Sequence, residues 1–279
     1  NRKFLLVGWA VLKKRIIPLM LLKDSRLVKG QCFSSYRDVG DPVKSAMVYS
    51  DQDADELMLL NLDGATGLDR LLKILPKLTE SVFMPLSLGG GISSFEHAAR
   101  LIECGADKVV VNSSLYQNPT LIENISKRYG VQAMVASIDV KYVDGDYNLY
   151  SSNGTIKESI CLKDHVQQCI DKGAGEIVIQ NIDKDGSIDK GAGEIVIQNI
   201  DKDGSMMGFD IQLAKLVHDM STVPVVLASG CGDYSHISDA FSQSHVSAVA
   251  CGSLFNFSDS SPIRAKSYLS NYGVPYKQQ

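Results

Sequence analysis

The chain has 279 residues, of which 44% are hydrophobic and 22% are charged, so it can bury a sizeable core and has the composition of a soluble globular protein. Its net charge of −4, without a basic stripe, argues against a nucleic-acid partner, and its longest apolar run near the N-terminus is too short to span a membrane. The 6 cysteines are scattered and form no CxxC motif, which indicates reduced thiols in a cytoplasmic protein.

Short apolar runs alternate along the chain with amphipathic stretches of helical period, which predicts repeated strand–helix units. The runs expected as buried parallel strands are 15–22, 56–61, 83–88, 108–112, 133–139, 176–180 or its twin 194–198, 224–229 and 248–252. Helices are expected at 94–105, 159–173 and 209–220. Such units fit a closed (β/α)8 TIM barrel, with an open doubly wound sheet as the alternative. We expect residues 1–10 to be an N-terminal appendage and residues 11–279 to form a single barrel domain.

One segment of the chain is duplicated in tandem around the expected sixth strand. IDKGAGEIVIQNIDKDGS occupies residues 170–187, and the same eighteen residues follow at once as 188–205. A closed eight-stranded barrel has no free edge, so only one EIVIQ run can be strand 6. We predict that it is the second copy, because that copy continues directly into MMGFD and the next helix. The residues at stake are Glu194, Asp203 and Gly204 in the second copy and Glu176 and Asp185 in the first.

A weaker repeat relates the two halves of the predicted barrel. GGGISS begins at Gly89 and GCGDYS at Gly230, and the spacing from Gly90 to Ser113 equals that from Gly230 to Ser253. Each glycine-rich turn and each small polar turn follows a predicted strand, where backbone N–H groups and helix N-termini can hold phosphate. Tight turns without a ligand are the alternative interpretation. Two matched turns, one per half-barrel, predict a substrate with a phosphate at each end.

Several segments in order along residues 12–275 resemble the ammonia-using cyclase subunit of imidazole glycerol phosphate synthase: RIIPLMLLKDSRLVKG, LGGGI, GADKVVVNSS, ASIDVKYVDGD, GAGEIVIQNIDKDGS and CGSLF. The resemblance implies a (β/α)8 barrel that binds a bis-phosphorylated aminoimidazole-carboxamide ribonucleotide. It implies a glutaminase partner, docked at the N-terminal face of the barrel, that supplies ammonia. We expect no cofactor, and no metal, because none of the 5 histidines follows a predicted strand.

The resemblance also assigns roles to single residues. It places one catalytic aspartate at Asp139 in SIDVK, and a further active-site acid in DKDG, at Asp203 or its twin Asp185. The family's other catalytic aspartate is replaced here by Leu21, and Asp24 has the wrong strand parity to substitute for it. Cys231 stands where the family usually has glycine. The expected substrate- and phosphate-binding residues are Lys29, Gly91, Asn112, Ser113, Gly204, Gly230, Gly232, Gly252 and Ser253.

A ring of alternating charge gates ammonia at the bottom of the family's barrel. It maps here to Arg15, Glu56, Lys108 and Glu194 or its twin Glu176. Each of these residues begins or closely precedes a predicted strand, so we expect them to meet at the N-terminal rim. Ion pairs that only stabilise the barrel are the alternative, but the complete set of four favours ammonia passage.

The sequence therefore predicts a cyclase-like lyase of histidine biosynthesis that pairs with a glutaminase. Two alternatives follow from Leu21, since a leucine side chain cannot exchange a proton. One is a paralogue that channels ammonia for sugar amidation in surface-polysaccharide synthesis. The other is a subunit without catalytic activity that only activates the glutaminase. Leu21 favours these two alternatives, whereas the complete phosphate set favours the cyclase or the paralogue.

Overall fold

The structure is a computed structural model that describes residues 13–31, 34–182 and 206–273 of the chain. Within these ranges, eight parallel strands pair side by side and close into a barrel, because β12 pairs with β1 as well as with β11. The barrel strands in order are β1 (Arg15–Lys23), β4 (Leu57–Asn61), β5 (Leu86–Gly89), β6 (Lys108–Val111), β7 (Met134–Val143), β10 (Glu176–Asn181), β11 (Val225–Ala228) and β12 (Ala248–Cys251). The predicted (β/α)8 barrel is confirmed, and the open doubly wound sheet is excluded.

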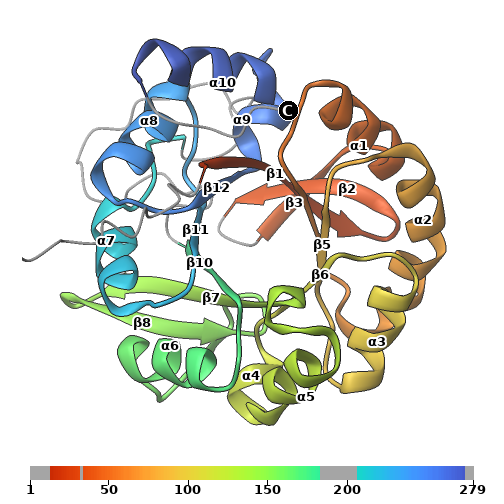
Figure 1. Cartoon of the computed structure of the whole chain (residues 1–279), viewed down its shortest axis with the longest axis vertical. Helices are drawn as coiled ribbons and strands as arrows, with labels where there is room; N and C mark the ends of the chain where they lie inside the picture. Colours follow the sequence, from red (N-terminus) through yellow and green to blue (C-terminus); the bar gives the residue numbers. More distant parts are fainter. Residues whose placement is uncertain (1–12, 32–33, 183–205, 274–279) are drawn as a thin grey trace, which may run out of the picture.

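Helices form an outer ring around the strands (Figure 1). They are α1 (Pro42–Asp51), α2 (Leu68–Ser81), α3 (Phe95–Glu103), α4 (Ser114–Gln117), α5 (Thr120–Tyr129), α6 (Leu162–Asp171), α7 (Ile211–Met220), α8 (Tyr234–Gln243), α9 (Ser253–Phe257) and α10 (Pro262–Asn271), with short 3-10 turns at Gly64–Gly67 and Val131–Ala133. Ser94 and Asp210 begin α3 and α7 by accepting a hydrogen bond from a first-turn N–H. No helix in the described ranges is both long and apolar enough to cross a membrane.

Side chains of the strands alternate between two hydrophobic clusters. Ile177 and Ile179 of β10 pack in the layer between strands and helices, whereas Val178 belongs to the cluster that fills the barrel interior. The other members of this inner cluster are Ile17, Leu19, Met58, Val110, Val135, Val226, Ala228, Ala248 and Ala250. Because these side chains exclude water from the lumen, polar inward-facing residues are favourable only near its two ends.

The first copy of the duplicated segment forms the sixth barrel strand. β10 pairs in parallel register with β7 and β11, so that Gln180 lies opposite Asp139 on one side and Ala228 on the other. The prediction that the second copy would be this strand is therefore wrong. The reason is local: α6 ends at Asp171, and the short turn 172–175 leads directly into β10, whereas the second copy is preceded by DKDGS. The second copy lies outside the described residues, as do residues 1–12 with the expected appendage.

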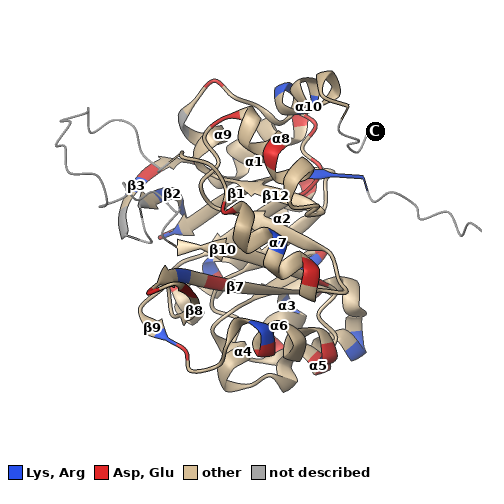
Figure 2. Ribbon diagram, turned by 90° about the vertical axis from the view of Figure 1, so that its left-hand side faces the viewer, with Lys and Arg blue, Asp and Glu red and all other residues tan. Residues whose placement is uncertain are grey.

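Two hairpins that the sequence did not indicate extend from the barrel. β2 (Arg26–Gln31) pairs antiparallel with β1 and with β3 (Ser34–Gly40), and β8 (Asp146–Ser151) pairs antiparallel with β7 and with β9 (Ile156–Lys157). In a side view both hairpins lie at the same end of the barrel (Figure 2). This is the end at which the parallel strands finish, so the hairpins form walls around the opening.

The two copies offer a matched pair of substitutions that tests which one is in the barrel. Val178→Asp places a carboxylate in the apolar lumen and should lower the free energy of unfolding by about 4 kcal/mol. Val196→Asp makes the same change in the second copy and should lower it by less than about 1 kcal/mol. Urea unfolding of both variants measures the difference.

If Val196→Asp destabilises the protein more than Val178→Asp does, the second copy is strand 6. If neither single substitution has a large effect but the double variant is unstable, the two copies replace each other in the barrel.

Candidate active site

The C-terminal ends of five barrel strands surround a pocket of about 430 Å³. Its floor and inner walls come from β1, β4, β6, β7 and β10, and the glycine turn after β5 closes one side. Tyr36 of β3 and the turn residues Ser152 and Asn153 between β8 and β9 complete the walls, so both hairpins contribute to it. Barrel proteins carry their active sites at this end, because the loops after the strands converge there.

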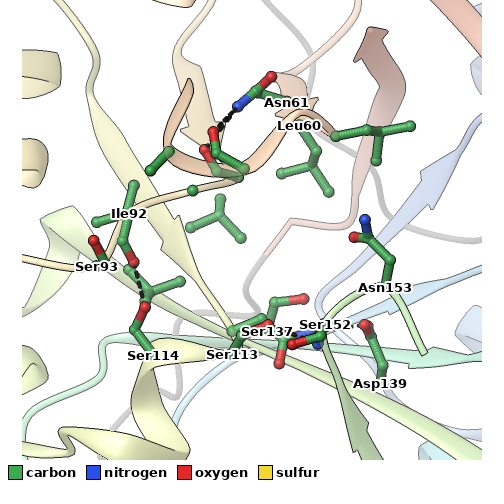
Figure 3. A pocket seen from close by; sticks show the side chains of 18 of the residues that line it. Leu60, Asn61, Ile92, Ser93, Ser113, Ser114, Ser137, Asp139, Ser152 and Asn153 are labelled. Atoms are coloured by element: carbon green, nitrogen blue, oxygen red, sulfur yellow. Dashed lines mark hydrogen bonds between the residues drawn. The ribbon is translucent and has the colours of Figure 1, made fainter. Parts of the chain in front are cut away.

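Small polar residues and Asp139 gather on one side of the pocket, whereas Asn61 is beside Leu60 on the other side (Figure 3). The small polar residues are Ser113, Ser137 and Ser152. Leu21 lies beside Leu60, because the two are register partners on β1 and β4, and both line the pocket. A ligand with hydrogen-bonding groups toward the serines and Asp139 and an apolar face toward the two leucines matches this arrangement.

Asp139 is the one carboxylate among the described residues that line the pocket. It is 7% exposed, and its Oδ2 accepts a hydrogen bond of 2.8 Å from Nδ2 of Asn112 on the neighbouring strand end. This bond fixes the orientation of the carboxylate at the mouth of the barrel. A carboxyl group held in this way can take a proton from a bound molecule or, once protonated, give one to it.

Leu21 occupies an inward position of β1, in the same parity as Arg15, and lines the pocket. Asp24 is not among the residues that line the pocket. It lies in the exposed turn after β1 with a φ of +48°, and its Oδ1 pairs with Nη1 of Arg70 at 2.9 Å. The carboxylate of Asp24 is therefore engaged outside the pocket.

The first set of predicted phosphate residues comes together in the pocket. Gly91, Asn112 and Ser113 all line it, and Ser113 Oγ accepts a 2.9 Å hydrogen bond from the backbone N–H of Ser152. Gly91 has a φ of +82°, and a Cβ placed on it would lie 2.2 Å from the carbonyl oxygen of Gly64. Only glycine fits there, which lets the backbone approach a ligand closely.

The second set of predicted phosphate-binding residues lies after β11 and β12, and none of its described members lines this pocket. Gly230 has a φ of +91°, and the N–H of Gly232 donates a 3.2 Å hydrogen bond to Nδ1 of His236, a partner that sequence reasoning missed. Lys29 is only 4% exposed, and a Cβ on Gly252 would lie 3.5 Å from its Nζ. The structure therefore brings Lys29 to the turn that contains Gly252 and precedes Ser253.

At the opposite end of the barrel, four charged residues form a closed ring. Nη1 of Arg15 lies 2.7 Å from Oε2 of Glu56, and Nη2 of Arg15 bonds Oε1 of Glu176. Nζ of Lys108 lies 2.8 Å from Glu56 Oε2 and 3.0 Å from Glu176 Oε2. The four side chains therefore meet at the N-terminal ends of their strands, with Glu176 as the fourth member, while Glu194 lies outside the described residues.

The ring is electrostatically satisfied. Burial by itself raises the pKa of Glu56, but the charges of Lys108 and Arg15 outweigh it and hold that pKa below its ordinary value. Burial likewise acts to lower the pKa of Arg15, and the two glutamates raise it overall. Arg15 and Glu56 therefore keep their charge, and the ion-paired ring closes the N-terminal end of the lumen.

Four predicted residues lie outside the described ranges. They are Asp185, Glu194, Asp203 and Gly204. Their predicted roles remain predictions.

The geometry described so far defines a (β/α)8 barrel with a pocket at the C-terminal face and a charged ring at the other face. The chain matches the family described as histidine biosynthesis protein over residues 15–189 and 187–260. The two matched segments overlap where the first copy ends and the second begins, so each contains one copy. The chain belongs to this family.

Individual relatives match almost the whole chain. The imidazole glycerol phosphate synthase subunit HisF of Exiguobacterium sibiricum is 36% identical over 265 residues, which cover 95% of this chain and 99% of that protein. The protein of the same name from Thermotoga sp. (strain RQ2) is 35% identical, with 95% of this chain and 97% of that protein covered. That from Hydrogenobaculum sp. (strain Y04AAS1) is 33% identical, with 95% and 98% covered.

Alanine substitution of two glycines with similar φ angles distinguishes the cost of a steric clash from the cost of a positive φ. Gly91→Ala should lower the free energy of unfolding by more than about 2 kcal/mol, because the new Cβ meets the Gly64 carbonyl in addition to the strain of a positive φ. Gly145→Ala, at a φ of +88° with nothing within 4 Å of the Cβ, should cost only about 1 kcal/mol. Urea unfolding measures both, and equal losses would show that packing against Gly64 is not the constraint.

Proposed function

We propose that this chain is the cyclase subunit of an imidazole glycerol phosphate synthase. It would use ammonia from a glutaminase subunit to convert a bis-phosphorylated aminoimidazole-carboxamide ribonucleotide into imidazole glycerol phosphate and an aminoimidazole ribonucleotide. The observation that carries the proposal is the buried carboxylate of Asp139, held by Asn112 in the pocket at the C-terminal end of the barrel. Family membership and the HisF relatives that match 95% of the chain support it.

In this proposal the two ends of the substrate are held by different halves of the barrel. One phosphate is held by the backbone around Gly91 and by the Ser113 side chain, and the other by Lys29, Ser253 and the glycine turns after β11 and β12. Asp139 exchanges protons at the reacting centre between them, while Asp185 of the first DKDG assists. A positioned general acid or base contributes about 10²–10⁴-fold to a rate, so Asp139 accounts for a large part of the activity.

The charged ring is the proposed gate for ammonia, and the glutaminase is the proposed partner at that face. Support comes from the position of the ring, which closes the end of the lumen opposite the pocket. Ammonia is uncharged and can cross the apolar interior, whereas ammonium would have to lose its hydration there. A partner that loosens the ring while it releases ammonia would couple the two reactions.

Leu21 favours a second candidate function on the same scaffold. It places an apolar side chain in the pocket where the cyclase family has its other catalytic aspartate. A paralogue that delivers ammonia for sugar amidation in surface-polysaccharide synthesis needs the gate but not two proton-transfer groups. The same leucine is compatible with a subunit that only activates the glutaminase.

The decisive experiment combines the purified chain, a glutaminase partner with glutamine, and the bis-phosphorylated ribonucleotide. We expect imidazole glycerol phosphate to form, and Asp139→Asn to lower its rate by about 100-fold or more because the amide cannot exchange a proton. The affinity for the ribonucleotide should be retained, since the phosphates are held elsewhere. Product is measured by chromatography and affinity by calorimetry.

Asp144→Asn is the matched control for this substitution, since Asp144 is exposed in the β7–β8 turn, where its φ of +54° suits asparagine equally well. It should leave the rate unchanged. An unaffected rate in Asp139→Asn would remove Asp139 from the reaction. Stimulation of the glutaminase without any cyclised product would favour the two alternatives.

A separate substitution tests whether Leu21 limits the cyclase. Leu21→Asp restores a carboxylate in the pocket and should raise ammonia-dependent turnover by at least about tenfold. Leu21→Asn is the control, because asparagine has nearly the size and polarity of aspartate but cannot act as a general acid or base, and it should not raise the rate. Equal turnover in wild type and Leu21→Asp, with the fold intact by circular dichroism, would contradict this explanation and favour another acceptor.

A further inference from the structure

Two polar side chains deep in the pocket have no role in the function proposed so far. Ser137 is 6% exposed and Gln180 is 7% exposed, and both line the pocket. No hydrogen bond joins either side chain to another described residue, and neither polar group is among the fully buried atoms that lack a partner, so both groups are open to the pocket. A molecule bound in the pocket can therefore form hydrogen bonds with them.

The strand register places both groups next to Asp139. Gln180 of β10 is the direct partner of Asp139 on β7, and Ser137 precedes Asp139 by two residues on the same inward face. Ser137 is in turn opposite Val178, a member of the inner hydrophobic cluster. The pair therefore lies where the apolar lumen meets the polar side of the pocket.

The partly apolar bottom of the pocket and the uncharged side chains of Ser137 and Gln180 restrict what can bind beside them. Val110 of the inner cluster also lines the pocket, so the bottom of the pocket is partly apolar. Neither serine nor glutamine carries a charge, which suits a small neutral molecule with N–H groups. Ser137 Oγ and Gln180 Oε1 can both accept hydrogen bonds from such a molecule.

We propose that Ser137 and Gln180 form the receiving site for ammonia, an assignment that rests on the proposed ammonia-using function. Ammonia has three N–H donors, and two of them are taken up by the serine and glutamine oxygens. Its lone pair is then free to point at the bound acceptor. Asp139 stands on the adjacent strand position, where it can take up a proton from the nitrogen. The ribonucleotide is held above this level by its phosphates.

The test uses ammonium chloride as the nitrogen source, without glutaminase, and measures KM separately for ammonium and for the bis-phosphorylated ribonucleotide. Gln180→Met keeps the length of the side chain and Ser137→Ala removes only the hydroxyl. Each should raise KM for ammonium roughly threefold to tenfold, the range expected for one lost hydrogen bond. KM for the ribonucleotide should be unchanged in both.

Two further measurements separate this role from a structural one. The unfolding temperature of Gln180→Met should be equal to or above that of the wild type, because the substitution removes no hydrogen bond to another described residue. Gln167→Met makes the same change on the exposed face of α6 and should leave both KM values unaltered.

Several results would overturn the proposal. If KM for ammonium is unchanged, or if KM for the ribonucleotide rises instead, Ser137 and Gln180 do not hold ammonia. If Gln180→Met lowers the unfolding temperature and leaves both KM values unchanged, the amide is structural. If the wild type shows no ammonium-dependent turnover at all, the proposed cyclase function fails together with this inference, and the wild-type measurement alone distinguishes that case.

Discussion

Closure of the sheet through the pairing of β12 with β1 is the constraint on which the rest of the structure depends. A closed sheet fixes which side chains point inward, and the limited width of the lumen requires the central ones to be small or apolar. Polar groups are then pushed to the two ends. One end receives Arg15, Glu56, Lys108 and Glu176, which neutralise one another, and the other receives the groups around Asp139.

The two ends differ in how their polar groups are satisfied. The ring at the N-terminal end is saturated by its own ion pairs, so it needs no ligand to be stable. The C-terminal end keeps the polar groups of Ser137 and Gln180 open to the pocket. These groups are available to a molecule that enters the pocket. The barrel is thus closed by ion pairs at one end and open to a ligand at the other.

The features that could be predicted from the sequence are those set by the position of a residue along a strand. The barrel strands could be predicted because apolar runs mark strands. The members of the charged ring came from the resemblance to the cyclase family, and their positions at the starts of the runs indicated that they lie at the same rim. Sequence reasoning could not find the bond between Gly232 and His236, which are only four residues apart, because that bond depends on the shape of the turn before α8. It could not find the wall formed by Ser152, because the contact of Ser152 with Ser113 joins distant parts of the chain. Gln180 was missed because it ends an apolar run and was interpreted only as part of the strand. The prediction of which copy forms strand 6 was wrong because it relied on the residues that follow the strand. In the structure, the strand in the barrel is the copy that directly follows α6.

The tandem duplication has a consequence for how this gene can change. The eight strands are complete with Glu176–Asn181, so the repeated segment is carried in the connection between β10 and α7. The strand copy in the barrel is under selection from every neighbour it packs against. The closed barrel has no ninth strand position for its twin, so we expect substitutions to accumulate in the twin first. An in-frame duplication in a closed barrel thus supplies additional sequence that can change without altering the eight strands.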